Sequence, residues 1–199
     1  EFRVNSITNQ DGSAGPQVCG VSTFSGKSGV QIPSGPTEFR RQDGGGRGRG
    51  VFGSGATPSG VNVMDLITIA TTGNSTDFGD DFKIRQENYS SFSSSIRGIN
   101  AGGYNPAAFT SIAFFTFASQ GGMNEFGDLI TAAYSNAGTS NQIRGLSFGG
   151  STGSVKINSI EFVTIASTGQ ANDFGSLTER VSNTGSGVSN GIRAFQMSG

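Results

Sequence analysis

The chain of 199 residues contains no histidine, no tryptophan and a single cysteine, Cys19. Without histidine it lacks the commonest general base and the commonest transition-metal ligand. A lone cysteine without histidine also excludes papain-like nucleophilic chemistry. Because one cysteine cannot form an intramolecular disulfide, a disulfide-stapled secreted scaffold is excluded, and we interpret Cys19 as a small buried hydrophobe. These absences favour a protein without catalytic activity, cofactor or metal.

Charge is equally scarce. Charged residues make up 14% of the chain and the net charge is −1, against roughly 25% charged residues in an ordinary soluble domain. Nucleic acid binding rewards a strongly basic face, so no nucleic acid partner is expected. No apolar run is long enough for a membrane-spanning helix, so no membrane insertion is expected. No signal peptide is evident, and we expect folding in a cytoplasm.

Glycine and phenylalanine are plentiful, with 33 and 16 residues respectively. A disordered chain would have few aromatic residues and a high net charge, and this chain has neither property. Many glycines with many aromatic residues are typical of an all-β fold with tight turns.

A Phe-Gly pair returns every 48 residues, and an acidic residue and an arginine return with it. The phenylalanines are Phe78, Phe126 and Phe174. The acidic residues that precede them are Asp77, Glu125 and Asp173. The last segment of each unit, which we call the closing segment, begins with an arginine, at Arg49, Arg97, Arg144 and Arg193. A period of this length indicates stacked supersecondary units, which favours a structural or binding role.

Three apolar stretches at the same period predict strands through their branched side chains: Val61–Ala70, Ile112–Ala118 and Ile157–Ala166. With a short Phe-Gly strand, a polar stretch and an Arg strand, each unit holds about four strands. We therefore expect an all-β body at 47–199, with four-stranded units at about 49–96, 97–143 and 144–199.

The repeated side chains have predicted structural roles. Each Phe is expected to be an inward anchor at the seam between units. Each Arg is expected to reach the repeated acidic residue of another unit as a bidentate pair. Such a pair would fix the register of the units and add little net stability.

Residues 1–46 differ from the repeats because Gly and Pro interrupt them every few residues. We interpret them as an extended docking arm with short strands at Gln17–Val21, Ser28–Ile32 and Thr37–Arg41, joined to the body by a hinge at 44–46. The stretch 44–50 also resembles a nucleic-acid-binding RGG element. It contains only two arginines and leads into a repeat strand, so we favour the hinge.

Three other motifs have a functional and a structural interpretation. Asp-Phe-Gly occurs in the magnesium loop of kinases, but the other kinase motifs are missing, which favours a structural turn. Asp77, Asp80 and Asp81 could bind calcium, although the third copy has Ser176 in place of one acid. The Tyr-, Ser- and Asn-rich loops could bind glycans or be plain solvated loops.

The order of the strands resembles the kelch-type repeat. A strand ending in Gly-Gly, a small aliphatic strand, an aromatic strand and an Arg-containing strand follow one another at Arg97–Gly103, Ile112–Ala118, Asn124–Leu129 and Tyr134–Arg144. Phe stands where that family usually has Trp, and its Tyr-Asp pair is missing. The resemblance implies a propeller-like body.

A second resemblance is more specific. The segment Thr164–Arg180 is similar to repeats in structural proteins of tailed bacteriophages, especially those of marine cyanobacteria, and 4–16 is similar to N-terminal segments of phage fibre and appendage proteins. This resemblance implies a non-enzymatic virion protein, in a fibre, a tail or a capsid appendage. The arm would dock onto the particle by strand addition, leaving the repeat body exposed. A receptor- or glycan-binding tip is the alternative, and a polysaccharide-degrading enzyme, which would need paired carboxylates, comes third.

Three units are too few for an ordinary propeller, which has about four to eight blades. The units could close as a β-prism, stack in a trimeric fibre, or share a ring with other copies. A further copy of the closing strand at Arg193–Gly199 could complete the first unit. We therefore expect a homo-oligomer, with a trimer favoured, that also contacts other virion proteins and has a host surface glycan as a possible ligand.

Overall fold

The computed structural model describes residues 48–199 apart from 57, 70, 87–88, 183–185 and 198–199. All regular structure in this part of the chain is β, in thirteen strands, which confirms the predicted all-β class. Across the same residues no helix is long and apolar enough to cross a membrane. The arm at 1–46, with its three predicted strands, its hinge and Cys19, lies outside the described residues.

The first sheet has three antiparallel strands in the order β1-β2-β3. They are β1 (Arg49–Ala56), β2 (Gly60–Thr68) and β3 (Thr76–Asp80). Strand β2 corresponds to the predicted strand at Val61–Ala70, where Val, Leu and Ile residues favour extended backbone.

The second and third sheets have four antiparallel strands each, in the orders β4-β5-β6-β7 and β11-β10-β9-β8. The second sheet contains β4 (Ser90–Ser93), β5 (Arg97–Ala101), β6 (Ser111–Thr116) and β7 (Asn124–Asp128). The third contains β8 (Ala137–Ser140), β9 (Arg144–Phe148), β10 (Ile157–Thr164) and β11 (Asn172–Val181). Strands β6 and β10 match the other two apolar predictions.

The last two strands, β12 (Ser186–Ser189) and β13 (Ala194–Met197), form a separate antiparallel hairpin. Strand β12 packs against β8, as β8 packs against β4. By their place in the repeat, β4, β8 and β12 correspond to one another, and so do β1, β5, β9 and β13. In the predicted units the polar strands β4 and β8 come last, at the ends of 49–96 and 97–143. In the structure each of them is instead the first strand of the following four-stranded sheet.

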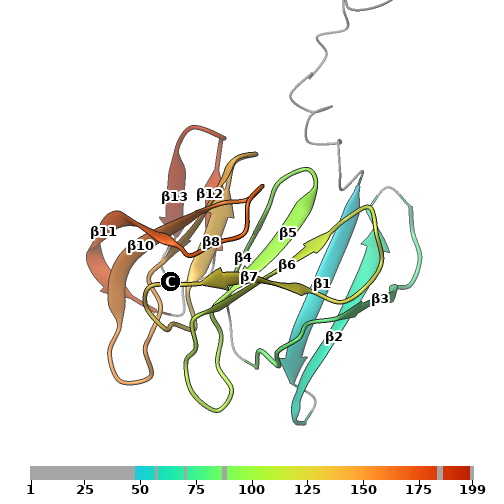
Figure 1. The fold of residues 1–199 in the computed structure, drawn as a ribbon, viewed down its shortest axis with the longest axis horizontal. Helices are drawn as coiled ribbons and strands as arrows, with labels where there is room; N and C mark the ends of the chain where they lie inside the picture. Colours follow the sequence, from blue (N-terminus) through green and yellow to red (C-terminus); the bar gives the residue numbers. More distant parts are fainter. Residues whose placement is uncertain (1–47, 57, 70, 87–88, 183–185, 198–199) are drawn as a thin grey trace, which may run out of the picture. The chain divides into compact units, whose positions relative to one another are not determined.

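The core lies between successive sheets. Met64 and Phe78 of the first sheet share one apolar cluster with Phe115 and Phe117 of the second. A second cluster joins the second sheet to Val163, Ile165 and Ala171 of the third. In Figure 1 the second sheet, in green and yellow, lies between the other two. Each short sheet buries its apolar face against a neighbouring sheet. We call each such sheet-to-sheet contact a seam, and the stability of the fold depends on the seams.

Candidate functional site

The Phe-Gly motif forms a β-bulge at the same place in all three sheets. In the first sheet Met64 lies opposite Gly79 and Asp65 opposite Asp77, so Phe78 has no partner across the strands. The same shift occurs at Phe126 and Phe174. A bulge adds one residue to one strand and redirects its side chain. The Asp-Phe-Gly motif is therefore a structural device that presents Phe to the neighbouring sheet.

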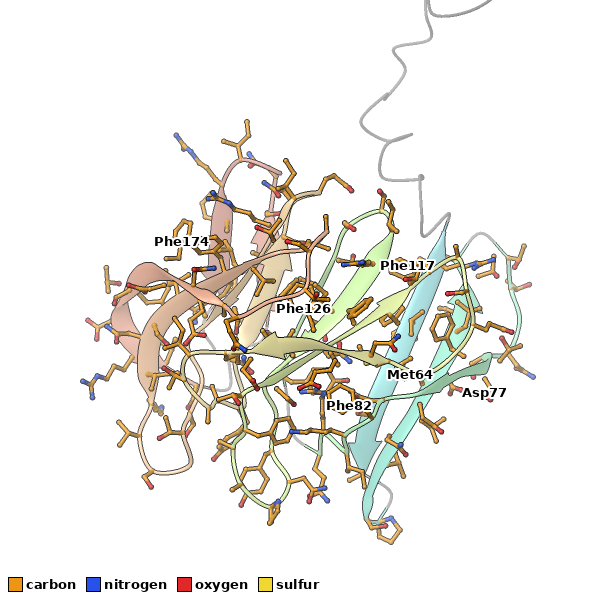
Figure 2. The ribbon with its side chains drawn as sticks, viewed as in Figure 1. Met64, Asp77, Phe82, Phe117, Phe126 and Phe174 are labelled. Carbon is orange, nitrogen blue, oxygen red and sulfur yellow. The ribbon has the colours of Figure 1, made fainter. Side chains whose placement is uncertain are left out.

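Two of the three Phe residues are the inward anchors that the sequence predicts. Phe78 is 2% exposed and meets the ring of Phe115 edge to face, with centroids 5.2 Å apart. Phe126 is 3% exposed and belongs to the cluster with Val163 and Ile165. Phe174 is 54% exposed, so the prediction is wrong for the third copy. Figure 2 shows Phe126 among the sheets and Phe174 on the outer sheet. The reason is that only the two-stranded hairpin β12–β13 follows the third sheet in the described part of the chain, and a hollow of 370 Å³ separates Phe174 from its Phe195.

Two of the four repeated arginines, Arg49 and Arg97, bind backbone carbonyls of the next sheet. Nη1 of Arg97 donates to the carbonyl oxygens of Ile165 at 3.1 Å and Ala166 at 2.9 Å. Nη1 of Arg49 donates to the carbonyl oxygen of Phe117, at the corresponding place one sheet earlier. The predicted Arg-to-acid pairs are therefore wrong for these two residues. Strand ends leave carbonyls without a ladder partner, and a guanidinium can satisfy them.

Arg144 and Arg193 make different contacts. The guanidinium of Arg144 lies 4.8 Å from the ring centroid of Phe162 in its own sheet, much as Arg97 lies 4.6 Å from that of Phe114. The side chains of both Arg144 and Arg193 are exposed. The stacking on the aromatic ring is therefore shared by Arg97 and Arg144, whereas the carbonyl contact needs a following sheet.

The repeated acidic residues act locally. Oδ1 of Asp77 accepts the amide of Gly79 at 3.1 Å, and Oδ1 of Asp173 accepts that of Gly175 at 3.0 Å. Each Asp therefore caps its own bulge. Glu125, at the corresponding position, is exposed. Asp77 and Asp173 therefore have a structural role, as predicted, but each binds an amide of its own bulge and not the predicted arginine.

Backbone hydrogen bonds complete each seam. The amides of Gly121 and Met123 donate to the carbonyls of Phe78 and Asp80, each at 2.8 Å. In the next seam the amides at 169 and 171 donate to the carbonyls at 126 and 128, again at 2.8 Å. Main-chain contacts of this kind depend little on side-chain identity, so the seam can recur while the sequence varies.

Buried ionisable groups break the repeat at two places, and the contacts they make there were not predicted from the sequence. Asp81 and Arg85 form a fully buried ion pair, with Nε to Oδ2 at 2.7 Å. Nη1 of Arg85 also donates to the carbonyls of Gly102 and of Ser111, the latter at 3.1 Å. The corresponding residues of the second copy are Leu129 and Ala133. That departure from the repeat pattern was the available signal.

Glu161 is the second such group. Its carboxylate accepts the amides of Ile130 at 2.8 Å and Thr131 at 3.0 Å from the preceding sheet. Burial raises its pKa above the ordinary value, and the two amide hydrogen bonds oppose that rise. Burial likewise raises the pKa of Tyr89, whose hydroxyl donates to the carbonyl of Gly53. All of these groups are bound to backbone within the fold, so they hold segments in place.

Hollows adjoin the seams. One of 370 Å³ lies between the third sheet and the hairpin β12–β13 and is lined by Phe174, Leu177 and Phe195. A cleft of 790 Å³ between the first and second sheets is lined by β1 together with Tyr89, Phe92 and Phe115. It lies alongside β1, where the second and third sheets have a fourth strand. A polar hollow of 590 Å³ is lined by the turns at 93–95, 140–143 and 189–191, which are rich in Ser, Asn and Gln.

The structure does not gather the three acids considered for calcium. Asp81 is bound to Arg85, while Asp77 and Asp80 are exposed on β3. Among the described residues no group of three or more Cys, His, Asp or Glu side chains is placed to hold a metal ion. The recurring seam is thus the feature on which a functional assignment can be based.

In comparison with known proteins, no family model matches this chain and no curated protein is significantly similar to it.

Proposed function

We propose that the protein is a non-enzymatic structural subunit of a tailed-phage particle, part of a fibre, a tail or a capsid appendage. The observation that carries the proposal is the seam: sheet joins sheet twice through the same Phe, the same Arg and the same backbone amides. A chain whose described buried charges are all bound within the fold suits a scaffold. The phage assignment comes from the resemblance of Thr164–Arg180 to phage structural repeats.

The finer architecture is part of the same proposal. We take the sheets to be kelch-like units of a propeller-like or prism-like body that works as a homo-oligomer. The arm at 1–46 docks on the particle, and the body projects outward. This division of labour rests on the change in composition near residue 47 and on the strand-rich body that begins at Arg49.

The test is a phage that encodes the protein without residues 1–40. We expect the shortened protein to fold, by its circular dichroism, and to be missing from purified particles analysed by mass spectrometry. A full-length variant with Ser154→Ala, an exposed turn residue, is the control and should enter particles normally. If the full-length protein is itself missing from particles, the structural role is wrong. If the shortened protein still enters them, or does not fold, the division between arm and body is wrong.

The polar hollow favours a receptor- or glycan-binding role as a second candidate. Hydroxyl and amide groups are suited to sugar hydroxyls, and those of Ser140, Asn141 and Gln142 in this hollow also bind backbone atoms of its turns. Saturable binding of the protein to host polysaccharide, lost in Asn141→Ala/Gln142→Ala, would support it. Binding that the double substitution leaves unchanged would rule out this hollow as the glycan site.

A further inference from the structure

The outer side of β11 presents the same groups that form the two seams inside the molecule. Phe174 projects from its bulge with 54% of its surface exposed, whereas Phe78 and Phe126 are buried under the following sheet. The guanidinium of Arg144 is exposed, whereas Arg97 binds the carbonyls of Ile165 and Ala166. This side of the third sheet is therefore half of a seam.

The glycines of the bulges give independent evidence of this open side. A Cβ on Gly79 would lie 2.5 Å from the backbone of Gly121, and one on Gly127 would collide with the carbonyl oxygen of Gly169. A Cβ on Gly175 would meet no atom within 4 Å. In the two internal seams a loop of the next sheet fills the space beside the glycine. Beside Gly175 no described residue fills that space.

The first sheet presents the matching half. Moving one period of 48 residues back from Phe117, Gly121 and Met123 gives Ile69, Gly73 and Ser75. Ile69 is 68% exposed although its counterparts Phe117 and Ile165 are buried. Figure 1 shows the first sheet and β11 on opposite sides of the second sheet. The two halves therefore face away from each other and cannot meet within one body.

We propose that a second copy of this chain binds head to tail, its first sheet packing on β11 through a third seam of the same construction. Phe174 of one copy packs on Ile69 of the other. Arg144 donates to the carbonyl of that Ile69, and the amides of Gly73 and Ser75 donate to the carbonyls of Phe174 and Ser176. The proposal rests on the internal seams and holds whether or not the protein belongs to a phage particle.

The incoming sheet takes the place of β13. Strands β1 and β13 occupy corresponding positions in the repeat, so only one of them can pair with β12. Strand β13 pairs over four residues and its Phe195 and Met197 are largely exposed, whereas β1 spans eight residues and packs Val51 on a core cluster. Strand β13 is therefore the one to leave.

The same exchange fills the cleft beside β1. Strand β12 of the first copy becomes the fourth strand of the incoming sheet, against β1 and next to β4, where the 790 Å³ cleft lies. The chain's own residues at the corresponding positions, 42–45, are Gln, Asp, Gly and Gly. Gly and Asp disfavour strands, whereas Val188 of β12 favours one. The second copy therefore supplies the better strand.

Two substitutions test the proposal by blocking opposite halves of the seam. Ile69→Glu blocks the first sheet and Phe174→Glu blocks β11, and both positions are exposed, so neither should disturb folding. Ile96→Glu is the matched control, because Ile96 is 59% exposed on the turn between β4 and β5 of the middle sheet. The full chain and the variants are compared by light scattering after size-exclusion chromatography, with thermal unfolding to check the fold.

The full chain and Ile96→Glu should associate as concentration rises, into a ring or an open chain, because the contact is heterologous. Each blocked variant should stay at the monomer mass of 20.4 kDa. An equimolar mixture of the two blocked variants should give a dimer of twice that mass and nothing larger, since one intact pair of halves remains. A full chain that is monomeric throughout, or a mixture that stays monomeric, overturns the proposal.

Two further variants separate the seam from general stickiness. Gly175→Ala strains the backbone at a φ of 138° but places its methyl group in open space within one copy, and it should abolish association because that methyl group would meet the incoming loop. Removing residues 193–199 deletes β13 and should raise the association constant by removing the competing strand. Unchanged association in Gly175→Ala contradicts the seam, and weaker association after the truncation contradicts the strand exchange.

Discussion

Asp81 and Arg85 stand where the second copy of the repeat has Leu129 and Ala133. Both pairs are buried, so one structural position accepts either an ion pair or an apolar pair. A buried ion pair is costly to break from one side because the remaining charge has no partner, and it is often replaceable as a whole.

We therefore expect Asp81→Leu alone and Arg85→Ala alone each to lower the free energy of unfolding by about 3–5 kcal/mol. The double substitution copies the second unit, and should recover at least about 2 kcal/mol of the summed loss. Urea unfolding of the four proteins measures this. Losses that simply add would show that the ion pair is not replaceable here.

Glu161 gives the fold a dependence on pH. Its pKa is raised in the folded chain above the ordinary value of 4.5, so the folded chain keeps a proton that the unfolded chain has lost. The free energy of unfolding should accordingly fall as pH rises from about 4.5 through the raised pKa, and the loss should persist at higher pH.

Urea unfolding from about pH 4 to about pH 8 tests this dependence. Glu161→Gln should lower stability overall, because one of the two amides at 130 and 131 loses its acceptor, and it should flatten the curve between the ordinary and the raised pKa. If the free energy of unfolding of Glu161→Gln fell with pH as steeply as that of the unchanged chain, another group would be responsible for the pH dependence.

At the scale of the element, the bulges at Gly127 and Gly175 form a matched pair. Both glycines have positive φ, 154° and 138°, so any side chain strains both. Only Gly127 also lies against the loop of another sheet. Gly127→Ala should therefore destabilise the chain more than Gly175→Ala, by at least about 1 kcal/mol, in chemical unfolding at low protein concentration. Equal losses would mean that strain alone governs both sites.

The sequence predicts the strands better than it predicts their grouping. Apolar stretches with branched side chains located β2, β6 and β10, because such side chains favour extended backbone locally. The joining of β4 to β5, and of β8 to β9, depends on hydrogen bonds across turns that resemble other polar turns in the chain. The arginine contacts were mispredicted for a related reason, since main-chain carbonyls are present everywhere and leave no mark in the sequence.

At the scale of the molecule, stability should fall from the middle sheet toward the hairpin β12–β13. Ile99 and Ile112 of the middle sheet are almost fully buried, whereas Val188 and Phe195 of the hairpin are largely exposed. In a stack where each sheet contacts only its neighbours, the outer layers open first.

Amide hydrogen exchange should accordingly be fastest in β12 and β13 and slowest in β5 and β6. The measurement belongs at low protein concentration, where the chain is monomeric. Uniform protection across all sheets would indicate a single cooperative unit, contrary to a stack of semi-independent layers.

The exposure of Phe174 shows the limit of reading function from a repeat. The three Phe-Gly pairs are nearly identical in sequence, yet one lies at the surface because only a two-stranded hairpin follows its sheet among the described residues. No local pattern carries that information. The period itself was readable, and it led to the two buried anchors, Phe78 and Phe126, and to the positions of the two Asp caps, although the predicted partner of each Asp was wrong.

The recurring bulge also bears on how such a chain can change over generations. Every seam uses the same few contacts, so a tandem duplication of one 48-residue period inserts a layer that already fits both neighbours. A deletion of one period joins two surfaces that are also complementary. The length of the molecule can therefore vary in whole layers through recombination between its own repeats, without a new interface having to arise.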